Sequence, residues 1–539
     1  MKFFKSFVYV TVALALVLSV FTLTFNAIDI DVLPPTEKVE TIEIPYAYSS
    51  AVSIGTTQIT LDVEQSNTIG VPQNLHAITS TSSNITKFIW DSVSGAENYT
   101  IDFNNGQLTY NTTNANFSIS GLALNTLYSV KVRANTQEEN GSWSDEYNFQ
   151  LLSGTISNNL ILYNHINYIV PSNVVLENNT ELNIESGTKI YVYNNISITV
   201  NGILNITGTS EESVLITSIN DPANGGSGTT YWGGIIVGTT GLVDADYLTM
   251  RYGKFTVNGD LNLQNSSLSN CKDYGIYNYL SSVSDINIKN NNFTSAIYVK
   301  DSGYASFVIE ENTLSNANGY PFCVDLSGTA VNNDIYSYLM NENNTVSCLR
   351  NGIEIKGNVS TNKTLVSGMT YYASSSFSVN SGAELNISDN TVIYVLGSNT
   401  ITVNGALKVN GTSEESVLIT SINDPANGGA GTTYWGGITV STTGLVDADY
   451  LTMRYGKFTV NGDLDLQYSS LSNCKDYSIY NYLTSVSDIN VKNNNFTSAI
   501  YVKDSGYASF VIEENTISNA NGYPFCVDLS GTAVNNDIY

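Results

Sequence analysis

One stretch of this chain occurs twice without a single change, and this repetition limits what the chain can fold into. GTSEESVLITSINDPANGG occupies residues 208–226 and returns at 411–429. Trp232 is matched in the same way by Trp435, again 203 positions later. We therefore expect two tandem copies of one structural unit in place of a single large core.

The two copies do not cover the same length of sequence. The match becomes strong at Glu181 and continues to Tyr539, which corresponds to Tyr336 of the first copy. We expect the second copy to be incomplete at its C-terminal end. A second copy lengthens a repetitive fold, which we interpret as extended reach and not as a duplicated active site.

Inside each copy there is a finer rhythm of short apolar alternations. TELNIESGTKIYVYNNISITVNGILNITG is an example, and Asn, Gly or Ser closes each of its runs. Strands of this kind recur about every twenty residues, which is typical of a solenoid of short parallel strands. Apolar residues would stack inside, and Asn would line the turns, where it tolerates the left-handed conformation and forms ladders.

A series of motifs follows the repeated stretch in a fixed order. GTSEESVLITS leads into a loop rich in Gly, Asn and Asp, and WGGI follows at 232–235. This order resembles the right-handed parallel β-helix of pectin-lyase-like surface proteins, over most of residues 160–539. The resemblance implies that Trp232 folds over the loop while Gly233 and Gly234 permit a tight backbone.

Residues 71–152 carry a different pattern of alternating strands and turn signals. IWDSVSGAENYTI contains Trp90, and a later run alternates Leu124, Tyr128, Val130 and Val132. This segment resembles a fibronectin type III domain. The resemblance implies a two-sheet β-sandwich with Trp90 in the core and Tyr128 as the tyrosine corner. The predicted fold class is therefore all-β: a fibronectin type III sandwich followed by a right-handed parallel β-helix.

The N-terminus predicts export. Lys2 and Lys5 precede an uncharged, mostly apolar run, which is typical of a signal peptide, with an uncleaved N-terminal anchor as the alternative. Both interpretations make the chain extracellular or cell-surface. The expected domains are signal peptide 1–27, linker 28–70, fibronectin type III 71–153, β-helix unit 154–345, connecting segment 346–370 and incomplete β-helix unit 371–539.

Charge excludes two classes of partner. The net charge is −27, from 48 acidic and 21 basic residues, so nucleic acid and anionic lipid are repelled. We expect membrane contact only through the N-terminal segment or a C-terminal anchor beyond Tyr539. With only two His, histidine catalysis and histidine metal sites are not expected. An uncharged polar surface with 36 Tyr suits an extracellular polysaccharide or a cell-surface glycan as partner.

The strongest candidates for catalysis lie in LVDADYLTMRYGK. The β-helix resemblance implies either a basic residue beside Ca²⁺-binding carboxylates, as in lyases, or paired carboxylates, as in hydrolases. We favour a structural role, with the Asp residues in a turn and the Arg solvating an outward strand face, and assign no catalytic residue. The candidates set aside in this way are Asp244, Asp246 and Arg251, with Asp447, Asp449 and Arg454 in the second copy.

The loop and the aromatic pair after it have two interpretations each. Oxygens of Asn220, Asp221 and Asn224 suit Ca²⁺, the one cofactor considered, or belong to an ordinary loop. The pairs Tyr231-Trp232 and Tyr434-Trp435 either stack on sugar rings or cap the loop through Trp, the interpretation that we favour.

Five cysteines leave an odd number. Cys271 with Cys323, and Cys474 with Cys526, are candidate disulfides in an oxidising compartment. The alternative, which we prefer, is that the cysteines point inward as small apolar side chains.

Together these patterns predict an exported, adhesin-like or structural repeat protein that presents a rigid β-helix for glycan or surface contact along its length. The alternatives are a secreted polysaccharide lyase or glycoside hydrolase of the pectin-lyase fold, and a cell-envelope layer or sheath component.

Overall fold

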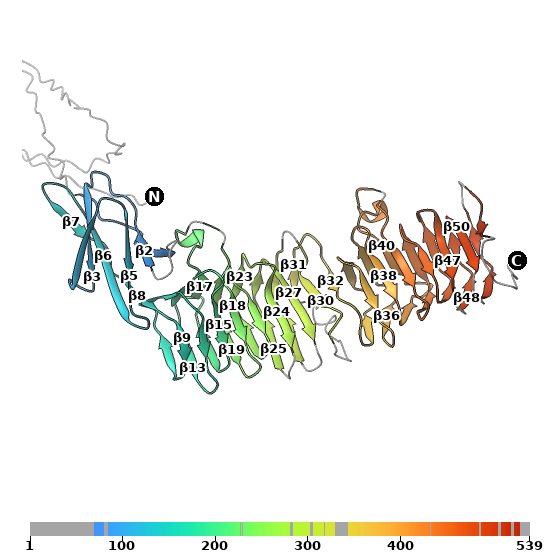
Figure 1. Ribbon diagram of the computed structural model, residues 1–539, viewed down its shortest axis with the longest axis horizontal. Helices are drawn as coiled ribbons and strands as arrows, with labels where there is room; N and C mark the ends of the chain where they lie inside the picture. The colour runs from blue at the N-terminus through green and yellow to red at the C-terminus, as the bar shows by residue number, and fades with distance from the viewer. Residues whose placement is uncertain are drawn as a thin grey trace, which may run out of the picture. The chain divides into compact units, whose positions relative to one another are not determined.

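The computed structural model describes residues 69–79, 85–226, 228, 230–280, 284–301, 305–316, 319–328, 343–431, 433–484, 487–504, 508–518 and 522–528. The expected signal peptide and all of the expected linker except its last two residues lie outside these ranges. The described residues are β-strands joined by short turns, with two 3₁₀ helices, η1 (Pro222–Asn224) and η2 (Pro425–Asn427) (Figure 1). None of their helices has the length and apolar character that crossing a membrane requires.

The first domain is the predicted β-sandwich. One sheet is formed by β1 (His76–Thr79), β2 (Ile85–Ile89) and β5 (Asn116–Ser120). The other contains β3 (Asn98–Phe103), β4 (Leu108–Thr112), β6 (Leu127–Asn135), β7 (Asn140–Trp143) and β8 (Tyr147–Leu151). Trp90 is buried between them, with its ring edge-on to Tyr99 at 5.4 Å. Tyr128 Oη accepts a hydrogen bond from the Ala123 N–H at 2.8 Å, which is the geometry of a tyrosine corner.

The sandwich passes into the solenoid through a shared sheet. β8 pairs in parallel with β11 (Asn167–Val170), the second strand of the first solenoid turn. Ile169 on β11 and Ile219 further along pack into the hydrophobic core of the sandwich. The two domains are therefore joined by backbone hydrogen bonds and by apolar packing.

Each solenoid turn contributes three strands, which we call its first, second and third strands, and equivalent strands of successive turns pair in parallel. The first strands of the first copy are β10 (Leu160–Leu162), β13 (Glu181–Glu185), β16 (Ile203–Thr207), β19 (Leu242–Asp246), β22 (Asp260–Gln264), β25 (Ser284–Lys289) and β28 (Ala305–Glu310). The second strands are β11, β14 (Lys189–Val192), β17 (Val214–Ser218), β20 (Leu248–Arg251), β23 (Ser267–Ser269), β26 (Asn292–Phe293), β29 (Thr313–Leu314) and β31 (Thr345–Val346). The third strands are β9 (Gly154–Ile156), β12 (Val174–Leu176), β15 (Ser197–Val200), β18 (Gly234–Val237), β21 (Phe255–Val257), β24 (Tyr274–Leu280), β27 (Ala296–Asp301), β30 (Phe322–Asp325) and β32 (Ile353–Lys356).

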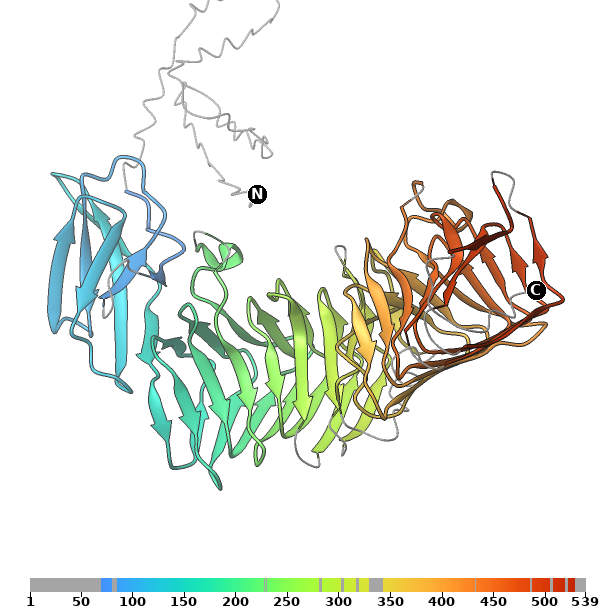
Figure 2. The same ribbon diagram turned by 45° about the vertical axis from the view of Figure 1, so that its right-hand side comes forward.

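The second copy repeats this arrangement, and the stacked strands of both copies are seen in Figure 2. Its first strands are β33 (Lys363–Leu365), β36 (Glu384–Ser388), β39 (Ala406–Asn410), β42 (Leu445–Asp449), β45 (Asp463–Gln467), β48 (Ser487–Lys492) and β51 (Ala508–Glu513). Its second strands are β34 (Thr370–Ala373), β37 (Val392–Val395), β40 (Val417–Ser421), β43 (Leu451–Arg454), β46 (Ser470–Ser472), β49 (Asn495–Phe496) and β52 (Thr516–Ile517). Its third strands are β35 (Phe377–Val379), β38 (Thr400–Val403), β41 (Gly437–Val440), β44 (Phe458–Val460), β47 (Tyr477–Leu483), β50 (Ala499–Asp504) and β53 (Phe525–Val527).

Strict alternation within each short strand builds the solenoid core. On β13 and β16, Leu182 and Leu204 lie in register and both are almost fully buried, while the residues on either side of them point outward. The turns use asparagine as predicted. Asn291 Nδ2 donates to the carbonyl of Leu263 in the preceding turn, and its own N–H donates to Asn312 Oδ1 of the following turn, which forms a ladder.

The two copies are offset by one strand where they meet. β32, a third strand of the first copy, pairs with β34, a second strand of the second copy. The third-strand sheet of the first copy is thereby continuous with the second-strand sheet of the second. Equivalent outward residues of the copies, such as Tyr277 and Tyr480, consequently lie on different sheets.

Candidate functional site

The carboxylates of the first copy that we set aside as catalytic candidates lie in a strand and not in the turn that we expected. Asp244 and Asp246 both point outward from β19, because parallel pairing with β16 and β22 extends this segment. Asp244 Oδ1 accepts from Asn262 Nδ2 at 2.8 Å, and Asp246 Oδ1 accepts from Asn265 Nδ2 at 2.7 Å. These carboxylates take part in outward ladders of polar side chains.

The second copy gathers more negative charge at the same place. Asp465 stands where the first copy has Asn262, directly in register with Asp447. Burial, together with the charges of Asp447 and Asp465, raises the pKa of Asp449 above its ordinary value. Asp465 Oδ1 accepts hydrogen bonds from Gln467 and Asn490, so these groups form a hydrogen-bonded cluster on an outward sheet face.

The arginines of this motif, which we expected to solvate an outward strand face, are instead held in ion pairs with the loop. Arg251 Nε lies 2.6 Å from Asp221 Oδ2, and Arg454 Nε lies 2.7 Å from Asp424 Oδ2. Both aspartates are almost fully buried. Each arginine thus fastens the loop of its own copy to the next turn of the solenoid, since β17 stacks on β20 and β40 stacks on β43.

The side chains considered for Ca²⁺ take part in hydrogen bonds that order this loop. Asp221 caps η1: its Oδ1 accepts from the Ala223 N–H at 2.9 Å, and its Oδ2 accepts from Thr217 Oγ1 at 2.7 Å and from Asn224 Nδ2 at 3.2 Å. Asn220 Nδ2 donates to Thr230 Oγ1 at 3.0 Å. Within the described ranges, no three His, Cys, Asp or Glu side chains gather in a group that would hold a metal.

The two tryptophans and their neighbouring tyrosines are placed differently. Trp232 and Trp435 are only 4% and 3% exposed, and each indole N–H donates to a backbone carbonyl, that of Arg251 or Arg454, at 2.9 Å. These tryptophans cap the loop and offer no ring face to a sugar. Tyr231 and Tyr434 are exposed, so only the tyrosines of the four stacking candidates present an accessible side chain.

All five cysteines are free, which corrects the alternative of two disulfides. Cys323 is fully buried, and burial raises the pKa of the Cys271 thiol to about 12 and that of Cys474 to about 11. Cys271 and Cys474 each donate to a backbone carbonyl two residues earlier at 3.7 Å. These two therefore stay protonated and behave as small, weakly polar side chains.

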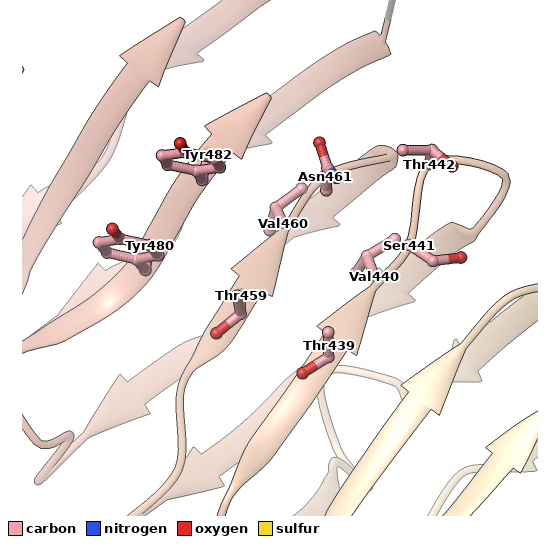
Figure 3. Close-up of a pocket in the computed structure, with 9 residues that line it drawn as sticks. All are labelled: Thr439, Val440, Ser441, Thr442, Thr459, Val460, Asn461, Tyr480 and Tyr482. Atoms are coloured by element: carbon pink, nitrogen blue, oxygen red, sulfur yellow. The ribbon is translucent and has the colours of Figure 1, made fainter. Parts of the chain in front are cut away.

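The third-strand sheet of the second copy carries a hollow that we did not predict from the sequence (Figure 3). It has a volume of about 600 Å³ and lies over β41, β44 and β47 and the turns that follow β41 and β44; two of its lining residues, Val440 and Val460, are themselves buried. The lining residues are Thr439, Val440, Ser441, Thr442, Thr459, Val460, Asn461, Tyr480 and Tyr482.

Strand register arranges these side chains in rows. Thr439 pairs with Thr459, and Thr459 pairs with Tyr480 on the next strand. Tyr480 and Tyr482 alternate with a buried Asn481, so both rings lie on the outward face, with planes 3° apart and centroids 6.4 Å apart (Figure 3). Tyr480 also stacks on Tyr501 of β50, with ring centroids at 4.5 Å.

Lysines surround the tyrosine rings. Lys457 Nζ lies 5.5 Å from the centre of the Tyr480 ring, and Lys503 Nζ lies 5.1 Å from that of Tyr482. Lys503 also pairs with Asp528 at 3.3 Å, and this carboxylate accepts from Tyr501 Oη at 2.6 Å. Cation–π contacts of this kind hold the rings in place on the sheet surface.

A second hollow of about 650 Å³ follows the corner between the second and third strands of the first copy. Its lining residues are Asn270, Cys271, Asp273, Tyr274, Thr294, Ser295, Ala296, Ser315, Asn316, Gly319, Tyr320 and Glu354. Burial raises the pKa of Tyr274 and of Tyr320 to about 12, so both phenols stay protonated at neutral pH. Two carboxylates, Asp273 and Glu354, thus share one polar hollow.

Sequence reasoning missed both hollows for one reason. No conspicuous motif marks them, because each hollow collects ordinary residues from several turns. The alternating tyrosines of YNYL at 480–483 were the available signal, because residues two apart in a strand share a face.

Comparison with known proteins agrees with this architecture. Residues 70–150 match the fibronectin type III domain, and residues 154–267 match the pectate-lyase-like beta helix domain. The chain carries a fibronectin type III domain followed by a pectate-lyase-like β-helix. Among curated proteins there is no significant match.

The solved structures that are similar to parts of the chain include the following three. A structure titled "FN3tt mut" shares 15% identity with a TM-score of 0.14, and covers 15% of this chain and 94% of its own. An Fn3-like protein from Clostridium thermocellum shares 25% identity with a TM-score of 0.13, and covers 15% of this chain and 88% of its own. A family 28 exopolygalacturonase from Yersinia enterocolitica shares 10% identity with a TM-score of 0.16, and covers 86% of this chain and all of its own.

Proposed function

We propose that this chain is an exported surface or secreted protein that binds glycans without cleaving them, through the tyrosine-lined hollow of its second copy. The observation that carries the proposal is the pair of outward rings of Tyr480 and Tyr482, set beside a row of hydroxyl groups. Export rests on the charged and apolar N-terminal segment.

The chemistry of the hollow suits a sugar. Aromatic rings on a surface offer apolar faces to the C–H groups of a pyranose, and nearby hydroxyl and amide groups hydrogen-bond its hydroxyls. Tyr482 provides the open face, since Tyr501 and Lys457 lie against the Tyr480 ring, and Thr439, Thr459 and Ser441 provide hydroxyls. Tyr482 is 41% exposed, so its ring is open to a ligand.

The same lining supports binding in preference to turnover. None of the nine side chains is a carboxylate, a histidine or a lysine. General acid–base catalysis of glycoside cleavage needs such groups within reach of the scissile bond. The hollow can therefore bind a polymer, but its lining lacks the groups that would cleave one.

Retention on immobilised polysaccharides tests this proposal. We expect the chain to be retained on at least one neutral polymer of a panel, and the Tyr480→Ala, Tyr482→Ala double variant to elute unretained. Tyr468→Ala is the matched control, because Tyr468 is 50% exposed and stacks on Tyr450 away from the hollow. Equal retention of all three proteins would contradict the proposed site.

The enzyme alternative has its own observation, which is the shared hollow of Asp273 and Glu354. Two carboxylates facing one cavity are the equipment of a glycoside hydrolase. The retention experiment therefore includes a measurement of new reducing ends. Release of reducing ends by the wild type, abolished in Glu354→Gln, would replace the binding function with hydrolysis; we expect no release.

A further inference from the structure

We propose that the chain forms a two-fold dimer through the free edge of β4 in its fibronectin type III domain. The partner is a second copy of the same chain, whose β4 pairs with this one in the antiparallel direction. The inference goes beyond glycan binding, because it concerns a surface of the sandwich and not the hollow on the solenoid.

The first observation is an unpaired strand edge. β4 ends the sheet that runs from the second strands of the solenoid into the sandwich. One side of β4 pairs with β3, and in the part of the chain that the structure describes no strand pairs with the other side. Such an edge presents backbone N–H and C=O groups that another strand can satisfy.

Nothing in β4 protects this edge. Proteins that stay monomeric commonly guard a free edge with a charged side chain, a proline or a bulge. The sequence of β4 is LTYNT, and its five residues pair with β3 without a shift in register. The strand therefore has none of these three protections, and it is open to pairing.

The second observation is the lack of charge around the edge. A net charge of −27 makes two copies of this chain repel each other in general. Residues 103–130, which include β4, contain no Asp, Glu, Lys, Arg or His. On the neighbouring β3 the one acid is Asp102, and its Oδ2 lies 3.2 Å from Lys131 Nζ. Two copies can thus approach each other along β4 without bringing unpaired like charges together.

The third observation is exposed apolar area in the same uncharged segment. Leu108, Leu124 and Leu127 are 48%, 50% and 52% exposed. Leu108 directly follows the turn between β3 and β4. Ser129, two residues after Leu127, exchanges two hydrogen bonds with Asn104 of that turn. Leu108 and Leu127 therefore lie at the same end of the sandwich, where a partner along β4 would cover apolar surface.

A second copy fits this edge because a two-fold axis places a strand antiparallel to its own counterpart. β4 needs no rearrangement to accept it, since Tyr110 in the middle of the strand is already held against the Phe117 ring, with centroids 4.7 Å apart. The solenoid strands stand at the opposite end of the sheet order and leave the edge free. Together with the proposed function, a dimer offers two hollows to one polymer, which raises retention through avidity.

Sedimentation of the full chain in the analytical ultracentrifuge tests the inference. We expect a reversible monomer–dimer equilibrium over roughly 1–100 µM, because a five-residue strand makes a small interface. Higher salt should favour the dimer, since it screens the repulsion between two acidic chains.

Substitutions at exposed positions locate the contact. Leu108→Glu and Asn111→Glu should each give monomers, because each brings two like charges together across the two-fold axis. Ser118→Glu is the matched control: it adds the same charge at an exposed position on β5, and it should dimerise like the wild type. Should Leu108→Glu fail to fold, Asn111→Glu decides alone, since its carboxylate can still accept the hydrogen bond from Thr100 Oγ1.

The remaining outcomes overturn the inference. A wild type that is monomeric at every concentration and salt has no such contact. A dimer that survives both substitutions in β4 is formed elsewhere on the chain. Loss of the dimer in Ser118→Glu as well would show a general effect of charge and not a contact at β4. None of these results bears on the glycan-binding hollow, which the retention experiment tests by itself.

Discussion

Arg251 Nε lies 2.6 Å from Asp221 Oδ2, although thirty residues of chain separate the two side chains. The second copy repeats this contact between Arg454 and Asp424. A motif that suggested catalysis thus fastens a loop. Asp221 accepts hydrogen bonds from Thr217 of β17 and from the Ala223 N–H of the loop, and it forms an ion pair with Arg251 of the next turn, so one carboxylate joins two levels of the solenoid.

Asp221→Asn should destabilise the chain, because Arg251 loses its charge partner in a nearly buried place. Removing one member of a buried ion pair costs about 3–5 kcal/mol, and the partial exposure of Arg251 places the expected loss at the lower end. Chemical denaturation measures it. Asp424→Asn should behave alike, while Asp285→Asn, at an exposed position on β25, should change nothing. Equal midpoints for all three variants would refute the structural role.

Gly253→Ala should be destabilising because a methyl group has no room beside Trp232. An added Cβ would lie 2.2 Å from Trp232 Cε2, which forces the indole out of its place. Overpacking of this kind costs about 1–3 kcal/mol. Thermal denaturation and tryptophan fluorescence report it. Gly275→Ala is the control, since its Cβ would meet no atom closer than 3.4 Å. The packing argument fails if the two variants are equally stable.

Asn278→Val should stabilise the chain. Asn278 is 1% exposed, and neither its side-chain nitrogen nor its oxygen has a hydrogen-bond partner. It lies in register between Val257 and Val299, so a valine continues an existing apolar stack. Removing two unsatisfied buried groups should gain about 1–3 kcal/mol in the free energy of unfolding. Asn291→Val should lower the stability, because it removes the hydrogen bond from Asn291 Nδ2 to the Leu263 carbonyl in the asparagine ladder. A loss of stability in Asn278→Val would show that this amide is satisfied in solution.

Tyr298→Phe should make the chain less stable, and the deficit should depend on pH. Tyr298 Oη donates to Asp325 Oδ2 at 2.6 Å. Burial raises the pKa of Asp325, but hydrogen bonds from Tyr298 and Ser327 outweigh burial and hold it below the ordinary 3.8. Because the pKa of Asp325 is lower in the folded state, ionisation of Asp325 stabilises the fold above pH 3.8. This stabilisation is lost as the pH falls through the lowered value.

The expected deficit of Tyr298→Phe is therefore full at neutral pH, about 1.5–3 kcal/mol for a hydrogen bond to a charged group, and shrinks toward pH 2. Denaturation midpoints of both proteins across this range provide the measurement. A deficit that stays constant with pH would mean that the hydrogen bond from Tyr298 does not lower the pKa of Asp325.

Much of the fold was predictable because it depends on local chemistry. Leu182 and Leu204 reveal by alternation which face of their strands is buried, and Trp90 and Tyr128 mark the sandwich through residue types that few other folds place at that spacing. Asp244 lies in a strand although Asp favours turns, because parallel pairing with strands on both sides outweighs that local preference.

The amino-acid sequence by itself determined the repeat, the all-β class, the inward and outward faces of the strands and the position of the loop. These features follow from the two-residue alternation of strands and from the preferences of turn residues. Both depend only on residues that are close together in the sequence. Tertiary structure alone decided that Arg251 meets Asp221 and that Thr439 aligns with Tyr480. The reason is physical: such meetings depend on how many residues each turn takes to return to the same sheet, and this register is set by the stacking of whole turns on one another.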